Sequence, residues 1–371
     1  MTRSQQNKVA GALCGLAIGD ALGRELGSHP QRAPRSTQPP LGTGAPLVHG
    51  AATTWTLAVL DALLFRRHEE PLGQDLALRL QVLTAPMQGR ALRGSPGRLK
   101  NTLVASADRL ASGDDPRWAG ADEVLADGVF AALPFAFALG DSDEDVLAAM
   151  VDAVLVTHRH VRVLSSAALW LGGMRSWLRR PKQNHEDVLE DAQRFARETL
   201  AYLHAEHAGH IKGRALEAEG ALALSLAQAQ MAPCAADLLT PPGFDGRDAP
   251  ERLVFAALRF ASPSENDLST ALSQCLDAQG DADVSAPLLA ASRGLLVGLE
   301  HMPLGLLGRL KTRALLEARA QALFEARPPR VPPLIDEELR FSLYLQEGRE
   351  QTPAPIREIK KGRAQKQLKL L

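Results

Sequence analysis

The chain has 371 residues and a mass of 39.8 kDa; 45% of its residues are hydrophobic and 23% are charged. This is ample apolar material for a large packed core, so the composition excludes an intrinsically disordered chain. The 42 lysines and arginines balance the 43 aspartates and glutamates, and the net charge of −1 excludes a global field that would draw the chain to nucleic acid or to an anionic membrane.

The cysteines and the hydropathy profile indicate where the protein works. Cys14, Cys234 and Cys275 lie far apart in the sequence, without the spacing of a zinc site or a redox motif. The polar N-terminus lacks a cleavage signal, and no apolar run has the length of a membrane span. We therefore expect a reduced, cytoplasmic protein with no membrane segment.

The first predicted element is a helix over residues 9–27 with a regular glycine pattern. Glycines recur every four residues at Gly11, Gly15, Gly19 and Gly23. On a helix these positions lie along one face and leave it bare, so a second helix can approach closely. Close packing of this kind compensates for the roughly 1 kcal/mol that each glycine costs inside a helix.

Further helices follow a long irregular loop that is rich in proline, glycine, serine and arginine, over residues 28–46. Clear strand alternation is nearly absent, and alanine and leucine dominate, so the sequence predicts an all-α protein with one large compact domain over residues 6–327. Predicted helices cover residues 53–67, 73–83, 100–111, 128–139, 144–157, 161–178, 185–208, 215–229, 251–261, 265–278, 287–299 and 304–326.

The last part of the chain, residues 328–371, differs in composition. Prolines punctuate it, and its end is basic. We expect a solvated extension, helical only where it docks. A nucleic-acid contact is only weakly suggested, because the basic residues are not interleaved with aromatic residues on which bases could stack.

Residues 280–285, which read GDADVS, are the best candidate for chemistry. Asp281 and Asp283 are separated by one small residue and could direct their oxygens at one hard cation such as Mg²⁺. The same pattern also serves as the cap of a helix, because carboxylates near a helix N-terminus are favourable. Both interpretations stay open on these residues alone.

Three segments in order resemble the ADP-ribosylglycohydrolase family. The first is GALCGLAIGDALG at residues 11–23, the second is THRH at residues 157–160 followed by a small-residue helix, and the third is GDAD at residues 280–283 with GLEHMP at residues 298–303. The resemblance implies a compact all-α orthogonal helical domain. It also implies removal of ADP-ribose by hydrolysis of a glycosidic bond, with two divalent metals held by carboxylates.

One half of the implied metal site departs from the family pattern. The family has Thr-Asp-Asp-Thr at the start of its second core helix, whereas residues 53–56 here read TTWT. Thr53 keeps a hydroxyl that could reach a metal, but Thr54 and Trp55 stand where the family has its two aspartates. Two Mg²⁺ ions carry four positive charges, which Asp281 and Asp283 alone do not neutralise. We therefore expect no metal, or one weakly bound Mg²⁺ at Asp281, Asp283 and Thr53.

The implied ligand cleft also departs from the family. Residues 126–134, ADGVFAALP, match a cleft segment of the family, but its Met-Arg pair is missing. Asp127 adds a negative charge that disfavours a diphosphate, and Val284 replaces a family threonine. Gly128, His158 and Gly280 remain as candidate ligand-binding residues by resemblance.

Three functions follow from these observations. The first is a degenerate family member, a pseudoenzyme that binds a ligand of the ADP-ribose type or a partner protein. The second is an active hydrolase on an altered substrate, with one Mg²⁺ at Asp281 and Asp283 and with Asp283 assisting proton transfer. The third is an accessory subunit of a protein or nucleic-acid complex, docked through residues 28–46 or 328–371. We favour the first.

Overall fold

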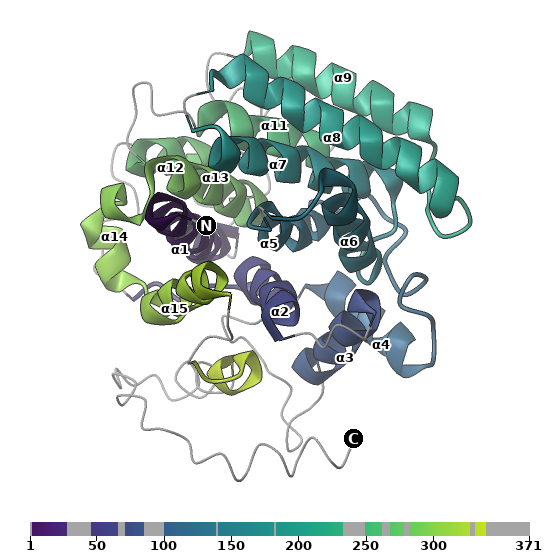
Figure 1. The fold of residues 1–371 in the computed structure, drawn as a ribbon, viewed down its shortest axis with the longest axis horizontal. Helices are drawn as coiled ribbons and strands as arrows, with labels where there is room; N and C mark the ends of the chain where they lie inside the picture. Colours follow the sequence, from purple (N-terminus) through teal and green to yellow (C-terminus); the bar gives the residue numbers. More distant parts are fainter. Residues whose placement is uncertain are drawn as a thin grey trace.

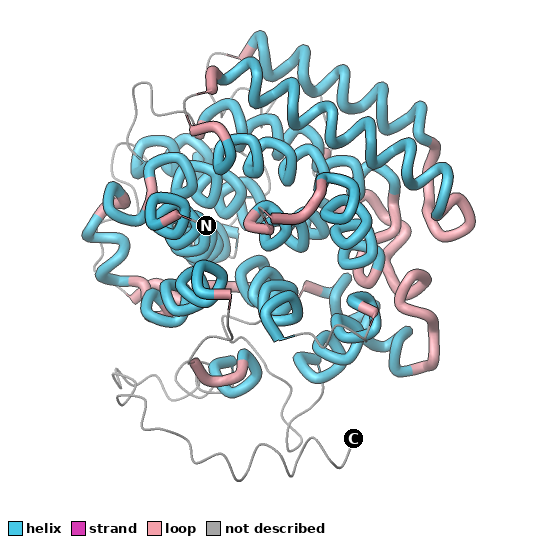
Figure 2. The backbone as a smooth tube through the Cα atoms, in the orientation of Figure 1, coloured by secondary structure: helices cyan, strands magenta, loops and turns pink. Residues whose placement is uncertain are grey.

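The structure, a computed structural model, describes residues 2–27, 46–65, 71–84, 100–138, 140–181, 183–232, 249–261, 268–277, 282–326 and 331–338. Within these ranges the chain is helical, and the only extended contacts are three isolated bridges, such as that between Leu47 and Leu310. The predicted all-α fold class is confirmed, and Figure 2 shows helices joined by loops throughout the described chain. No helix among the described residues is long and apolar enough to cross a bilayer.

The helices follow the predicted order closely. The first half of the chain forms α1 (Arg3–Gly27), α2 (Ala51–Phe65), α3 (Leu72–Thr84), α4 (Asn101–Ala111), the 3-10 helix η2 (Ala126–Ala132), α5 (Leu133–Ala136), α6 (Asp143–Leu155) and α7 (Val161–Arg179). The second half forms α8 (His185–Glu206), α9 (Ala215–Met231), α11 (Pro250–Phe260), α12 (Leu268–Asp277), α13 (Ala282–Val297), η3 (Leu299–His301), α14 (Leu304–Arg309) and α15 (Arg313–Glu325).

Helices α1 and α13 pack closely against each other, from Gly11 to Gly23 of α1, and lie side by side in Figure 1. The predicted glycine face of α1 makes this contact. A Cβ atom at Gly15 would overlap the carbonyl group of Ala290, and a Cβ atom at Gly19 would overlap that of Ala286. The bare face of α1 thus lets the two backbones touch, as the spacing of four predicts.

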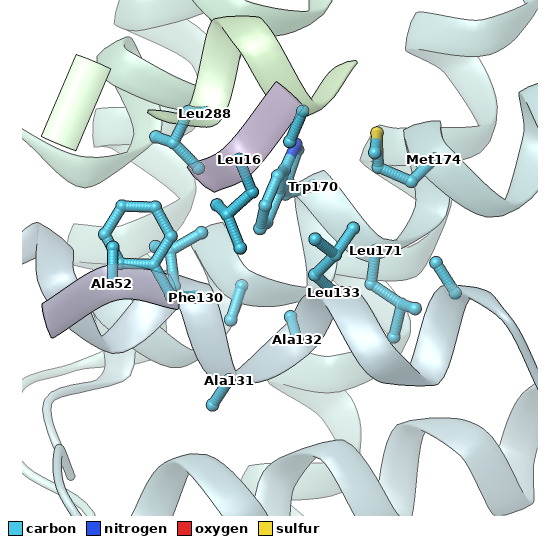
Figure 3. Packing of buried hydrophobic residues seen from close by; sticks show 14 of the residues in the cluster. Leu16, Ala52, Phe130, Ala131, Ala132, Leu133, Trp170, Leu171, Met174 and Leu288 are labelled. Atoms are coloured by element: carbon cyan, nitrogen blue, oxygen red, sulfur yellow. The ribbon is translucent and has the colours of Figure 1, made fainter. Parts of the chain in front are cut away.

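The rest of the core surrounds this pair. The side chains of Leu16 from α1 and Leu288 from α13 lie near Trp170 of α7 and Phe130 of η2 (Figure 3). The rings of Phe130 and Trp170 meet edge to face with their centroids 6.2 Å apart, and the indole N–H of Trp170 donates to Ser292 at 3.1 Å. Helices α7, α8, α9 and α11 form the layer beyond, with α9 at the outer edge of the molecule (Figure 1).

Two predicted helices at the C-terminal end have different limits. Helix α13 begins at Ala282, five residues before the predicted start at Pro287, because a proline in the second turn removes only one hydrogen bond. The predicted helix over residues 304–326 is broken into α14 and α15. Leu310 is extended at the break. The backbone N–H of Leu47 donates to the carbonyl oxygen of Arg309, and the backbone N–H of Lys311 donates to the carbonyl oxygen of Leu47.

The predicted helix over residues 128–139 is also different. It is the 3-10 helix η2 followed by the four-residue helix α5. Pro134 lies near the start of α5 and cannot donate a backbone hydrogen bond, so a continuous α-helix is interrupted there.

Part of the C-terminal extension is buried against the domain, where we expected a solvated segment. Residues 334–338 are helical, and Glu337 and Glu338 are buried. The carboxylate of Glu337 accepts hydrogen bonds from Arg319 of α15, whose guanidinium also donates to both oxygens of Asp61 on α2, at 2.8 and 2.9 Å. Residues 331–338 therefore join the core through charged side chains, whereas the domain boundary at residue 327 stays a prediction.

Candidate functional site

The Asp-x-Asp segment lies at the N-terminus of α13. Gly280 and Asp281 fall outside the described residues. Asp283 is the second residue of α13, and its side chain is about one-third exposed. Val284, at the position of the family threonine, is buried in the core. Of the two predicted carboxylate ligands, the structure thus describes one, and it faces a solvent-accessible corner of the domain.

The ammonium group of Lys100 is the partner of Asp283. Lys100 Nζ lies 2.9 Å from Asp283 Oδ2, and 28% of its side chain is exposed. Lys100 is the N-cap residue of α4, where it makes no side-chain capping bond. A cation is unfavourable at the positive end of a helix dipole. Lys100 therefore does not stabilise α4, and its ammonium group pairs with Asp283 instead.

Asp127 of η2 lies on the other side of Lys100. Its carboxylate accepts from Thr102 Oγ1 at 2.7 Å and from His158 Nε2 at 3.2 Å. Burial works to raise the pKa of Asp127, but the His158 imidazole and the Lys100 ammonium outweigh it and hold that pKa well below its ordinary value. Asp127 is thus an ionised carboxylate that is held by partners inside the protein.

His158 is fully buried beside Gly128. Its Nδ1 atom lies 3.0 Å from Thr157 Oγ1, so both ring nitrogens have protein partners. A Cβ atom at Gly128 would stand 2.6 Å from the His158 ring, so a larger residue there would displace the imidazole. The structure therefore brings these two predicted ligand-binding residues together, with both nitrogens of His158 engaged inside the domain.

The start of α2 is held by a carboxylate of α1. Asp20 Oδ2 accepts from the backbone N–H groups of Gly50 and Thr53, both at 2.8 Å. Gly50 is needed for this approach, since a Cβ atom there would lie 2.6 Å from Asp20 Oδ1. Burial raises the pKa of Asp20, and these hydrogen bonds partly offset the effect. Asp20 thus caps α2 and satisfies two of its free donors.

Thr54 contacts a carboxylate from the C-terminal segment. Thr54 Oγ1 lies 3.0 Å from both the carbonyl oxygen of Gly50 and Oε1 of Glu338. The same Glu338 oxygen is 3.2 Å from His49 Nε2, and His49 Nδ1 is 3.2 Å from Thr312 Oγ1. All these side chains are buried. A carboxylate therefore lies beside Thr54, but it is supplied by residue 338 and is also hydrogen-bonded to an imidazole.

Trp55 and Thr56 belong to the core. Trp55 is 1% exposed and packs with the buried hydrophobic residues. Thr56 Oγ1 lies 2.9 Å from the carbonyl oxygen of Ala52 and 3.1 Å from that of Phe130, which ties α2 to η2. The bulk that we expected at a former ligand position thus fills the interior.

The acidic residues near α2 have structural partners. Asp20 caps α2, and Asp61 forms a two-point ion pair with the buried Arg319. The described part of the chain contains no group of three or more histidine, cysteine, aspartate or glutamate side chains arranged to hold a metal ion. What it gathers at the corner is the ion pair of Asp283 with Lys100 and, near it, Asp127 hydrogen-bonded to His158 and Thr102.

The sequence profile of the ADP-ribosylglycohydrolase family matches residues 1–332. The chain belongs to the ADP-ribosylglycohydrolase family. The predicted family membership is confirmed, and it accounts for the three ordered segments at residues 11–23, 157–160 and 280–303.

One similar solved structure carries the description "ADP-ribosylglycohydrolase-related protein complex". It superposes with a TM-score of 0.57 and 21% sequence identity, over 88% of this chain and 99% of that one. At this identity the similarity establishes the fold. A comparison with curated proteins gives no match.

Three residues at the site were missed from the sequence. Lys100, Glu338 and His49 lie 183, 55 and 234 positions from Asp283, and none belongs to a motif. Lys100 did leave one signal, because a lysine at the predicted start of a helix opposes the helix dipole. Glu338 and His49 left none.

Proposed function

We propose that this family member does not carry the family's two-metal chemistry and acts by binding a ligand of the ADP-ribose type or a partner protein. The observation that carries the proposal is the ion pair between Lys100 and Asp283, at 2.9 Å. An ammonium group beside the remaining carboxylate supplies the positive charge that a cation would otherwise bring.

The charges at the corner support this proposal. A divalent cation near Asp283 would meet the Lys100 ammonium, and two like charges a few ångströms apart repel each other by about 1 kcal/mol per unit charge pair even in water. Asp127, the other nearby carboxylate, is already hydrogen-bonded to His158 and Thr102. The described residues therefore fit a metal-free site better than a dinuclear one.

The side chains at the start of α2 support it as well. A metal ligand must direct an oxygen or nitrogen at the ion. Thr54 directs its hydroxyl at Gly50 and Glu338, and Trp55 has only an indole N–H, which is a donor. Neither side chain replaces the charge of the aspartates that the family has at these positions.

The test is a hydrolysis assay together with thermal-shift titration. Purified full-length protein is incubated with ADP-ribosylated protein and with ADP-ribose, each with and without millimolar Mg²⁺ or Mn²⁺. We expect no metal-dependent release of ADP-ribose and no metal-dependent stabilisation by it. Asp283→Ala and the exposed control Asp114→Ala should both behave as wild type.

The competing function is the single-metal hydrolase. It predicts metal-dependent release of ADP-ribose by wild type and by Asp114→Ala, with loss of that activity in Asp283→Ala. This result would overturn the proposal. Stabilisation by ADP-ribose without metal would support the ligand-binding form of the proposal, and its absence would favour the partner-binding form.

We also propose a cellular location for the protein and two segments that could bind partners. We place it in the cytoplasm because its cysteines lack disulfide-type spacing and those described, Cys14 and Cys275, are free and buried. Residues 28–45 and 339–371 lie outside the described chain. Deletion of either segment, followed by pull-down, tests whether it recruits a protein or a nucleic acid.

A further inference from the structure

Helix α9 exposes an apolar face on the outside of the molecule. Three of its large side chains are among the most exposed hydrophobic residues of the described chain: Leu216 is 78% exposed, Leu224 is 56% exposed and Met231 is 84% exposed. Gly220, Ala223 and Ala227 are exposed between them. Because residues at spacings of three and four share a helix face, these six form one stripe, which we call the α9 stripe.

The opposite face of α9 is packed inside the domain. Ala218, Leu222, Ser225 and Ala229 are buried, and the neighbours of this helix are α7, α8 and α11. In Figure 1, α9 lies at the outer edge, with nothing described beyond it. The α9 stripe therefore does not take part in the packing of α9 on its own domain. Burying it against another surface would remove exposed apolar area from water.

The residues of the α9 stripe are arranged symmetrically about one point. Leu216 and Met231 are equally far from the middle of the stripe, between Ala223 and Leu224, and so are Gly220 and Ala227. Two α9 helices that run antiparallel about a two-fold axis at this point would bring Leu216 to Met231 and Gly220 to Ala227, and at the axis each Leu224 would face Ala223 of the other copy. A two-fold interface requires such self-complementarity, because the same patch serves both partners.

The charges beside the stripe fit the same arrangement. Glu217 and Glu219 flank it near the N-terminus of α9, and Gln228 and Gln230 flank it near the C-terminus. In the antiparallel pair each glutamate lies beside a glutamine of the other copy. At a rise of 1.5 Å per residue, equivalent glutamates of the two copies are about 13 Å or more apart along the axis. No like charges are opposed, and the two helix dipoles run antiparallel.

We infer that the α9 stripe binds a second copy of this chain and forms an antiparallel two-fold dimer. Gly220, Ala223 and Ala227 let the two helices approach, while Leu216, Leu224 and Met231 pack across the axis. A single helix of 17 residues is about 25 Å long. Its face is smaller than the roughly 800 Å² per partner of stable interfaces, so the dimer forms reversibly at micromolar concentration.

Analytical ultracentrifugation of the full-length protein between about 1 and 200 μM tests the dimer. We expect the wild-type protein to shift from monomer to dimer across this range. Leu224→Glu places a carboxylate from each copy at the axis and should raise the dimer dissociation constant by about 100-fold or more. The matched control Leu78→Glu changes a leucine of α3 that is 60% exposed, and should dimerise as wild type does.

Cross-linking tests the register of the two helices. In a Cys234→Ser background, Leu224→Cys lies near the axis and should cross-link to its own copy with a short bis-maleimide. Leu216→Cys should not, because its two copies are about 22 Å apart along the axis, but it should cross-link when mixed with Met231→Cys. The native thiols of Cys14 and Cys275 do not interfere, because burial raises the pKa of each to about 12.

Three results would overturn the inference. One is a wild-type protein that stays monomeric throughout the concentration range. Another is a dimer that persists in Leu224→Glu, which would place the interface elsewhere. The last is cross-linking of Leu216→Cys to its own copy, which would mean a parallel or shifted pair. Unchanged circular dichroism of each variant at 1 μM verifies that the substitutions leave the fold intact.

Discussion

The contact between α1 and α13 and the corner at the N-terminus of α13 differ in how they are built. Along the contact, backbone touches backbone, because Gly15 and its neighbours at spacings of four present no side chain to α13. At the corner, by contrast, Asp283 meets Lys100, a side chain from a distant part of the sequence. The contact between α1 and α13 depends on the absence of side chains at the glycines of α1. The corner depends on a side chain that a distant segment of the sequence supplies.

This difference explains how the two regions can tolerate substitution to different degrees. The packing of α1 on α13 tolerates almost no added atoms, because protein interiors are close-packed and backbone cannot move aside. The corner is part-exposed, and a charge there can be exchanged for another with little effect on the core. Substitutions in the two regions should therefore have very different consequences.

The largest effect should come from filling the contact between α1 and α13. Gly15→Leu would force a side chain into the carbonyl group of Ala290, so we expect a loss of about 5 kcal/mol or more in the free energy of unfolding, or no folded protein at all. Urea denaturation followed by circular dichroism measures it. As the control, Gly308→Ala in α14 meets no atom within 4 Å and should be neutral or slightly stabilising.

Breaking the buried ion pair of Arg319 should have the next largest effect. Arg319→Met leaves the buried carboxylates of Asp61 and Glu337 without their cation, and we expect a loss of about 3–5 kcal/mol. Chemical denaturation at pH 7 gives the value. The exposed pair of Arg194 and Glu198 provides the comparison, and Arg194→Met should cost no more than about 1 kcal/mol.

The protonation of Glu337 should make stability depend on pH. Burial, together with the nearby carboxylate of Asp61, outweighs Arg319 and raises the pKa of Glu337 from 4.5 to about 7. The folded state therefore binds this proton more tightly than the unfolded state. Its contribution is complete below about pH 4.5 and is lost as the pH rises to 7, by an amount on the order of 1–3 kcal/mol.

Glu337→Gln should remove this pH dependence. The amide cannot ionise, so the difference in unfolding free energy between variant and wild type should grow more favourable to the variant from pH 4.5 to pH 7. Denaturation at four or five pH values across this interval measures the slope. An identical slope in both proteins would show that Glu337 titrates normally and that residues 331–338 are not held as described.

A smaller loss of stability is expected from a change at Thr54. Thr54→Val keeps the shape of the side chain but removes the hydroxyl between Gly50 and Glu338, which should cost about 1–2 kcal/mol. Thermal denaturation is sensitive enough to detect it. If Glu338→Gln is made first, the loss from Thr54→Val should shrink, because the two side chains share one contact.

The sequence predicted the helices and the glycine contact well, because both follow from local periodicity. It failed where a single tertiary contact determines where a helix ends. An example is Leu310, which pairs with Leu47. At the site, the roles of Asp283 and of the TTWT segment stay predictions, and the sequence did not predict that Lys100 lies beside Asp283 or Glu338 beside Thr54. Both residues lie far from their partners in the sequence, and only the complete tertiary fold brings them together.

The most direct measurement of the central claim is Mn²⁺ binding by isothermal titration calorimetry to wild type, Lys100→Ala and Lys100→Arg. If Lys100 supplies the positive charge at Asp283, wild type and Lys100→Arg should bind Mn²⁺ no more tightly than millimolar. Lys100→Ala should bind it at least about 10-fold more tightly, because two carboxylates lose their cation. Micromolar binding by wild type, with no gain in Lys100→Ala, would contradict the account.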